Sequence, residues 1–280
     1  LAAQLAYWRA KLQGLETVSL PLDRRRAGPA SGTGRGGSVS ATIEPRLLDA
    51  VKTLAQRQGV TPFMLLLACF KILLARHCGT TDVAVGTPIT NRAHTALEPV
   101  VGTLVNTLVL RTSLEGDPGF DELLARVRST ALDAFAHQDV PFDNLVEALA
   151  QRRSEDVAPF VQVLFNVLNA PHARIEVDGL NCEAIEFDVG SSQFDLALSI
   201  DLQFFGKAHL TFLEDVFVPT TARRLLARYL SLVEQVAFGW AAQPVSRFDP
   251  LCAEDRFLLA QWNSTAAETP AVTVAPLLCL

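Results

Sequence analysis

The sequence has few of the features that stabilise or anchor proteins outside the cytoplasm. Its five cysteines are scattered, form no C-x-x-C pair and have no histidine at metal-ligand spacing, so neither a disulfide framework nor a zinc site is indicated. No apolar run reaches the roughly 18 residues that a membrane span requires, and the N-terminus lacks a basic region followed by an apolar stretch. We therefore predict a cytoplasmic protein with no metal site and no membrane contact.

Positive charge is also scarce, because 24 basic residues face 30 acidic ones and leave a net charge of -6. This balance disfavours a nucleic-acid partner. Hydrophobic residues make up 49% of the chain and charged residues 19%, with only 16 glycines. Such a composition is typical of a globular protein with a large core and excludes a disordered chain. The only methionine is Met64, and the chain opens within helix-like sequence, so we expect a piece of a longer polypeptide.

The run from Val100 to Arg111, VVGTLVNTLVLR, is almost entirely β-branched and aliphatic. It predicts a strand that is buried on both faces. The side chains expected in the interior are Leu104, Val105, Leu108, Val109 and Leu110. Asn106 is the one amide in this run, and a polar side chain there needs a partner or lines a cavity. Two interpretations stay open: Asn106 bonds neighbouring backbone, or it serves a functional site.

Hydrophobic periodicity predicts helices and strands along the rest of the chain. Helices are expected over 1–15, 45–59, 62–78, 118–138, 219–238 and 253–262, with a further one beginning at Pro141. Strands are expected over 38–43, 82–89, 160–168, 181–187 and 194–202, and the last of these opens a hairpin that turns near Gly206. Strands interleaved with helices imply a mixed sheet covered by helices.

Charged residues in two of these segments suggest structural roles. The helix over 62–78 is apolar almost all round, so Lys71 and His77 are expected at its margins, with His77 a cationic cap near the helix end. In residues 20–38 the arginine triplet 24–26 is followed by five glycines and a proline. We interpret this segment as an exposed connector with a solvated charge run and assign it no site.

Several short strings occur in an order that resembles one protein family. They are YW at 7–8, GTPITNR at 86–92, VGTLVNTLVLR at 101–111, HQDVPFD at 137–143, RSEDVAPFVQVLF at 153–165 and FDLAL at 194–198. Together they resemble the later core motifs of the condensation domain of nonribosomal peptide synthetases. The string PLCAEDRFLLAQWNST at 250–265 is similar to the linker that leads into an adenylation domain. The motifs cover nearly all of the chain in family order.

The resemblance implies the fold and its division into parts. The expected fold is α/β, a three-layer chloramphenicol-acetyltransferase-like lobe with a mixed sheet covered by helices, equivalent to one lobe of a V-shaped pair. Residues 1–37 would be the end of the preceding lobe and the exposed connector. Residues 38–240 would form the C-terminal lobe, and residues 241–280 the linker toward an adenylation domain. Half of such a pair should expose apolar surface, and we expect it around Leu5, Trp8 and the 190–213 hairpin.

The resemblance also implies an activity and partners. Condensation domains of this family form peptide (amide) bonds between a thioester donor and an aminoacyl acceptor, both held on phosphopantetheine arms of carrier domains. The expected partners are the upstream lobe, carrier domains and a downstream adenylation domain, and no cofactor is expected to bind directly. The family's active-site motif, H-H-x-x-x-D-G, belongs to the upstream lobe, and no H-H pair occurs in this sequence. We therefore expect no catalytic residue here.

Other functions share some of these sequence features. A non-catalytic scaffold that offers a carrier-protein docking surface would share the same motifs. A third interpretation is a free-standing acyltransferase of the same superfamily, but the sequence lacks the D-F-G-W-G motif of chloramphenicol acetyltransferase, and the adenylation-type linker favours a synthetase. Epimerisation domains share the fold, but HQDVPF and the adenylation-type linker suit condensation better.

The resemblance points to two sets of site residues. Candidates for lining a substrate tunnel are Asn91, Arg92, Gly102, Asn106 and Thr107. Residues expected to support the motifs are Trp8, Arg111, His137, Gln138, Asp139 and Arg153. Gly102 is expected to permit a close backbone approach, and Asn106 to present its amide near the channel or to hold the loop over 89–99, the expected tunnel floor. His137 is interpreted as a helix-corner histidine bonded to backbone.

Overall fold

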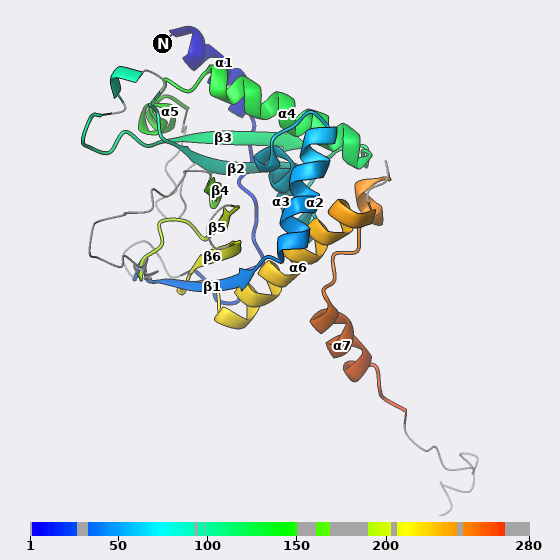
Figure 1. Ribbon diagram of the computed structural model, residues 1–280. Helices are drawn as coiled ribbons and strands as arrows, with labels where there is room; N and C mark the ends of the chain where they lie inside the picture. The colour runs from blue at the N-terminus through cyan, green and yellow to red at the C-terminus, as the bar shows by residue number, and fades with distance from the viewer. Residues whose placement is uncertain are drawn as a thin grey trace, which may run out of the picture. The chain divides into compact units, whose positions relative to one another are not determined.

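The computed structural model describes residues 2–26, 33–92, 95–97, 99–149, 161–168, 190–202, 206–239 and 243–266. The helices are α1 (Ala2–Leu12), α2 (Pro45–Arg57), α3 (Pro62–Cys78), α4 (Phe120–Ala136), α5 (Phe142–Leu149), α6 (Pro219–Gly239) and α7 (Ala253–Trp262). The strands are β1 (Gly36–Thr42), β2 (Asp82–Ile89), β3 (Asn106–Ser113), β4 (Val163–Leu168), β5 (Leu196–Asp201) and β6 (Lys207–Leu213) (Figure 1). These elements match the expected ones with two exceptions. The strand predicted over 100–111 begins only at Asn106, and the strand predicted over 181–187 lies outside the described residues.

The strands form one mixed sheet in the order β1-β6-β5-β4-β2-β3. Strand β4 runs parallel to β5 and to β2, whereas the remaining neighbours are antiparallel. The expected hairpin between β5 and β6 is present, and Gly206 has a φ of 55° in its turn. The prediction of a mixed sheet with helices is therefore confirmed.

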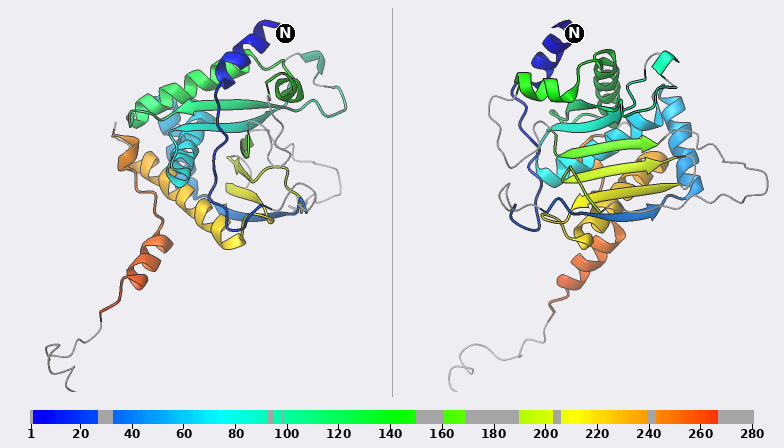
Figure 2. Two further views of the ribbon diagram at one scale, coloured as in Figure 1. Left: turned by 180° about the vertical axis from the view of Figure 1, so that it is seen from behind. Right: turned by 90° about the vertical axis from the view of Figure 1, so that its left-hand side faces the viewer.

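The two faces of this sheet differ in composition. Alternate residues of β4, β5 and β6 point toward the helices and are buried, namely Val163, Phe165, Val167, Leu196, Leu198, Ile200, Ala208, Leu210 and Phe212. In the right-hand view of Figure 2 the sheet is seen with α2, α3 and α6 behind it. The intervening residues point the other way, because successive side chains of a strand alternate between faces. They are mostly half-buried or exposed.

The predicted strand over 100–111 is wrong in its first half. Strand β3 begins only at Asn106, and before it Val101 is fully exposed, with Val105 59% exposed. The apolar pattern is not sufficient there because Gly102 has a φ of 146°, which does not fit a regular strand. Within β3 the prediction of burial is confirmed for Leu108, Val109 and Leu110. The strand lies at the edge of the sheet and not at its centre.

Helix α3 forms the centre of the core. Thr61 caps its N-terminus by accepting from the Met64 N–H, and Gly79 ends it in the left-handed conformation. Contrary to expectation, Lys71 does not lie at the margin of this helix, because its side chain is fully buried. Its Nζ donates to the carbonyls of Val83 (2.9 Å) and Leu110 (2.6 Å). The amino group therefore ties α3 to β2 and β3.

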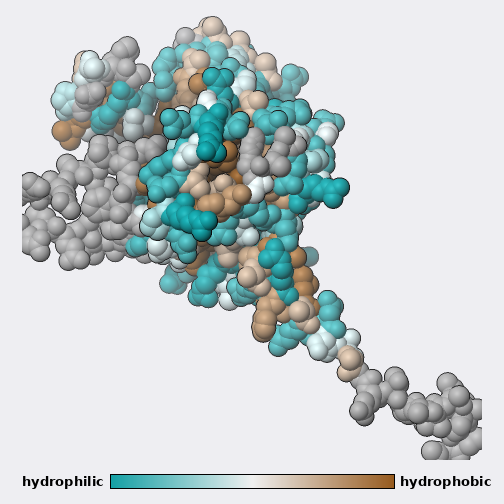
Figure 3. Space-filling view, turned by 45° about the vertical axis from the view of Figure 1, so that its right-hand side comes forward, coloured by the Kyte–Doolittle hydropathy of each residue, from teal (hydrophilic) through white to brown (hydrophobic). Residues whose placement is uncertain are grey.

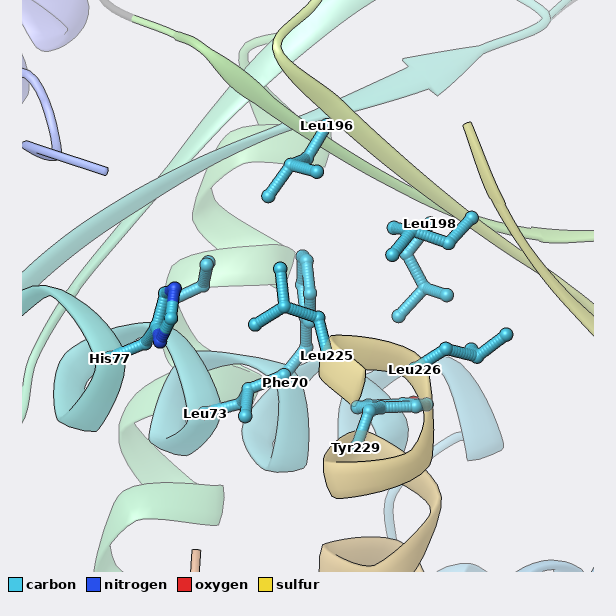
Figure 4. A pocket seen from close by; sticks show the side chains of 10 residues that line it. Phe70, Leu73, His77, Leu196, Leu198, Leu225, Leu226 and Tyr229 are labelled. Carbon is cyan, nitrogen blue, oxygen red and sulfur yellow. The ribbon is translucent and has the colours of Figure 1, made fainter. Parts of the chain in front are cut away.

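His77 does not act as the expected cationic cap. Figure 4 shows its ring at one side of a pocket lined by apolar side chains, among them Leu196 and Leu225. Burial, with the charge of Arg228 adding to it, lowers the pKa of His77, and its Nε2 has no hydrogen-bond partner among the described residues. The helix is instead ended by Gly79, whose N–H donates to the Ala75 carbonyl.

Residues 18–26 are packed more closely than an exposed connector would be. Val18 and Leu20 are buried, and the Asp23 carboxylate accepts from the Val218 N–H (2.9 Å) and the Thr221 hydroxyl (2.9 Å) at the start of α6. Arg26 is paired with Asp195 at 2.5 Å. The arginine triplet is thus partly engaged within the fold rather than fully solvated.

The chain forms two compact units, Leu1–Pro250 and Leu251–Leu280. In the second unit, α7 begins at Ala253, and the Asp255 carboxylate accepts from the Cys252 N–H (3.1 Å) before it. Phe257 and Trp262 are 68% and 62% exposed on this helix, and Figure 3 shows apolar side chains on its surface. In the described part of the chain, no single helix is long and apolar enough to cross a membrane; only the bent pair α2 and α3 meets that test together.

Candidate functional site

Asn106 joins the start of β3 to the corner between α4 and α5. Its Nδ2 donates to the carbonyls of Gln138 (3.0 Å) and Val140 (2.9 Å), and its Oδ1 accepts from the N–H groups of Phe142 (2.9 Å) and Thr107 (2.9 Å). Both hydrogens and the oxygen of the amide are therefore used by backbone groups. Asn106 holds the corner in place, and a role beside a channel stays a prediction.

Helix α1 docks on the other side of the same corner. Trp8 is fully buried, and its Nε1 donates to the carbonyl of His137 (2.9 Å). The ring of Tyr7 is stacked on His137, with 3.9 Å between the ring centroids. Gln4 and Asp139 exchange two hydrogen bonds, one of them from the Asp139 N–H. Trp8 therefore lies in the interior, and the expectation of an exposed apolar surface around it is wrong.

The ring groups at this corner make contacts that stabilise the fold. Nδ1 of His137 lies 2.7 Å from the carbonyl of Asp133, as expected for a histidine bonded to backbone at a helix corner. Burial, with the charge of Asp133 adding to it, raises the pKa of Tyr7 to about 12, so the phenol stays protonated at neutral pH. The Tyr7 hydroxyl has no hydrogen-bond partner in the described part of the chain.

Arg111 connects the sheet to the end of α1. Its Nε and Nη2 bind the carboxylate of Asp82 on the neighbouring strand, with a shortest distance of 2.7 Å. Its Nη1 donates to the carbonyls of Lys11 (3.0 Å) and Gln13 (2.8 Å). These carbonyls lie at the C-terminal end of the helix, where the unpaired groups of the last turn favour a cation. Arg111 thus acts as a C-terminal cap supplied from the sheet.

Arg92 organises the loop between β2 and β3. Its Nη1 donates to the carbonyls of Leu97 and Val100, the latter at 2.9 Å, and its Nη2 donates to the carbonyl of Gly102 at 3.1 Å. The preceding Asn91 has a φ of 51°, a conformation that asparagine tolerates better than most residues. One guanidinium therefore binds carbonyls from three places in the loop.

Gly102 is needed for its conformation and not for a close approach. A Cβ added at this position would meet nothing within 4 Å, so the expected steric reason is wrong. Its φ of 146° is a value that residues with a side chain rarely adopt. Arg153, the remaining candidate, lies outside the described residues.

We expect Arg92→Met to loosen this loop without unfolding the chain. The change keeps an unbranched side chain and removes the donors for three carbonyls, so hydrogen exchange at the Val100 amide, which donates to the Leu97 carbonyl, should rise about tenfold or more. The matched control is Arg126→Met at the other end of β3, where the guanidinium binds the carbonyls of Ser113 and Glu115. Exchange of the Val100 amide that is equally slow in both variants would contradict the role of Arg92.

The candidate residues thus fall into two groups: a junction where α1, β3 and the corner between α4 and α5 meet, and the loop between β2 and β3. Neither group places a nucleophile beside a base. The junction contains Trp8, Asn106, Arg111, His137, Gln138 and Asp139, and the loop contains Asn91, Arg92 and Gly102. Thr107 lies in β3 opposite Pro88. In the described residues, no group of three or more His, Cys, Asp or Glu side chains could hold a metal ion.

The mixed sheet and its helices define a chloramphenicol-acetyltransferase-like α/β lobe. The chain belongs to the condensation-domain family, because the family model described as "Condensation domain" matches residues 1–255. Both the resemblance and the fold expected from it are thereby confirmed.

Curated relatives are peptide synthetases. A linear gramicidin synthase polypeptide of Brevibacillus parabrevis is 37% identical over 276 residues, which are 95% of this chain and 4% of that protein. The dimodular nonribosomal peptide synthase of Bacillus subtilis (strain 168) is 34% identical over 279 residues, or 96% of this chain and 12% of that protein. The chain therefore spans only a small fraction of the relatives that it matches.

Solved structures of related domains have the same fold as this chain. The X-domain from teicoplanin biosynthesis superposes with a TM-score of 0.79 and 28% identity, covering 89% of this chain and 57% of that one. The four-domain nonribosomal peptide synthetase AB3403, solved with AMP and glycine, gives a TM-score of 0.79 at 20% identity, covering 88% of this chain and 20% of that one. The second match supports the fold alone.

Proposed function

We propose that this chain is the C-terminal lobe of a condensation domain that forms peptide bonds in the synthesis of a secondary metabolite. The observation that carries the proposal is the family match over residues 1–255, together with a chain that spans 57% of a related X-domain. The remaining part of such a domain would be the upstream lobe with the H-H-x-x-x-D-G motif. The acceptor amine would attack the donor thioester there, releasing the thiol of the carrier arm.

The lobe contributes positioning rather than proton transfer. Holding two carrier-bound reactants in one geometry supplies much of the rate enhancement in a two-substrate reaction. The clamped loop at Arg92 and the corner fixed by Asn106 are rigid elements of the kind that one wall of a substrate tunnel requires. Asn91, Gly102 and Thr107 belong to the same proposed wall.

The proposed partners follow from this assignment. They are the upstream lobe, carrier domains that bring their own phosphopantetheine, and an adenylation domain downstream of the linker over 241–280. A related synthetase with four domains has been solved with AMP and glycine, which supports a multidomain setting. A cytoplasmic location and the absence of a directly bound cofactor stay predictions.

A second candidate function is a docking lobe without catalysis. It is favoured by one comparison, since the X-domain from teicoplanin biosynthesis, 28% identical to this chain, was solved in a complex with OxyB. A lobe of this type could present a surface to another protein while the upstream motif is damaged. The state of that motif distinguishes the two functions.

The test compares the isolated chain with the chain joined to its upstream lobe. We expect no condensation of carrier-bound thioesters by the 280 residues alone, and turnover by the complete domain that is lost when the second histidine of the upstream motif becomes alanine. The measurement is formation of the dipeptidyl carrier thioester by mass spectrometry. Turnover by the isolated chain that is lost on His137→Ala would overturn the assignment. A complete domain that binds carriers without turnover would support the docking function instead.

A further inference from the structure

A row of polar side chains crosses the sheet on the face that points away from α3 and α6. The strand registers place Asn166 of β4 opposite Ser199 of β5, Ser199 opposite His209 of β6, and His209 opposite Ser40 of β1. The neighbours of each along its strand point toward the helices, so all four side chains share one face. Directly opposite residues have Cβ atoms about 5 Å apart. The row therefore runs across four strands.

These side chains keep unused hydrogen-bonding capacity. Ser40 and His209 are exposed, whereas Asn166 and Ser199 are half-buried. None of the four side chains makes a hydrogen bond with another residue in the part of the chain that the structure describes. An amide, an imidazole and two hydroxyls together offer both donors and acceptors. This differs from Asn106, whose amide is fully used by backbone groups.

The rest of this face indicates what kind of ligand the row would bind. In the next row Asp201 lies opposite Lys207, so the face offers no net charge there to attract an ion. In the row on the other side Ala197 lies between Thr211 of β6 and Leu164 of β4, so this row carries no charge. An apolar surface laid over the row would bury its polar groups without partners, and each such group would weaken the binding. A neutral ligand that itself carries hydrogen-bonding groups fits this face better.

We propose that Asn166, Ser199, His209 and Ser40 form a binding row for an amide-bearing substrate arm. This inference rests on the proposed function, in which the lobe forms one wall of the channel that carrier-bound substrates enter. The ligand class is the amide of an aminoacyl or peptidyl group on its pantetheine arm, lying across the strands. Asn166 and Ser199 pair with its carbonyl and N–H groups, and His209 accepts or donates one further hydrogen bond. The row binds substrate and takes no part in proton transfer.

The first test measures kinetics in the complete domain with aminoacyl pantetheine substrates. His209→Leu and Asn166→Leu should each raise the KM on the order of tenfold, as expected for a lost hydrogen bond to substrate, with kcat changed less than about twofold. His209→Gln should recover part of the lost affinity, since it keeps a donor and an acceptor. The matched control is Thr211→Val, on the same strand and face but in the neighbouring row. Equal KM values in all variants of an active domain would show that the polar row does not bind substrate. The proposed function would not be affected by that result.

The second test measures binding without turnover. It therefore separates the hypothesis of the binding row from the hypothesis that the domain catalyses condensation. The probe is an aminoacyl pantetheine in which a stable amide replaces the thioester, titrated into the labelled domain while the ring signals of His209 are followed by NMR. We expect these signals to shift with saturation and the shift to be lost in Asn166→Leu. Saturable shifts in a domain without condensation activity would support the row and contradict the proposed function. Unchanged His209 signals would overturn the row.

Discussion

Replacing Asn106 with alanine should lower the free energy of unfolding by about 3 to 5 kcal/mol, because three backbone groups from another part of the chain, one of them buried and two partly buried, would lose their partner. These groups are the carbonyls of Gln138 and Val140 and the N–H of Phe142. The side chain itself is only 8% exposed, so water cannot easily replace the amide. The measurement is denaturant-induced unfolding of the 280-residue chain.

Two further variants separate the parts of this effect. Asn106→Asp keeps the acceptor for the Phe142 N–H but places a carboxylate beside two carbonyls that need donors, so it should destabilise at least as much as alanine at neutral pH. Asn144 is an exposed asparagine on α5, and Asn144→Ala should change the stability by no more than about 0.5 kcal/mol. A loss at Asn106 as small as that at Asn144 would show that the corner stands without the amide.

The stability of the chain should rise with pH above neutrality because of Lys71. Burial lowers the pKa of this lysine to about 7, with the nearby Lys11 adding to the effect and Asp82 opposing it. The pKa in the unfolded chain is about 10.4. Between these two values the unfolded state binds a proton that the folded state does not, so the free energy of unfolding increases with pH across that window. The expected gain is several kcal/mol, and it is lost as the pH falls to about 7.

Lys71→Met should remove this pH dependence. Methionine has a similar length and no titratable group, so the difference in unfolding free energy between wild type and variant should move in favour of wild type from about pH 7 to about pH 10. The matched control is Lys52→Met on α2, where the lysine is exposed, and it should leave the slope as it is. Parallel pH profiles for wild type and Lys71→Met would mean that the ammonium stays charged in the core.

Helix and strand positions follow closely from the sequence where local signals agree. The helix over 62–78 is bounded by a threonine cap, a proline at the first turn and a glycine after its end, and each signal has a local physical cause. The hairpin near Gly206 follows in the same way. The strand predicted to begin at Val100 is wrong in its first half. The β-branched residues there favour a strand, but the backbone conformation of Gly102 interrupts it.

Residues whose roles depend on distant partners could not be placed in the same way. Nothing near Lys71 in the sequence shows that its side chain crosses to carbonyls of two strands. The polar row through His209 can be recognised only once the strand registers are known. Polar residues at alternate positions of β5 and β6 do indicate that one face of the sheet is not covered by helices. The family motifs indicated which residues belong to the junction. Most of their hydrogen-bond partners lie far away in the sequence and could be identified only from the structure.

The docking of α1 has a consequence for how the chain folds as it is made. Its hydrogen bonds to Arg111, His137 and Asp139 cannot form until about a hundred or more further residues have been synthesised. At about 5 to 20 residues per second this wait is on the order of ten seconds. Trp8 and Leu12 lack these contacts during that interval, so α1 reaches its final place only after the later-synthesised β3 and the corner between α4 and α5 are available.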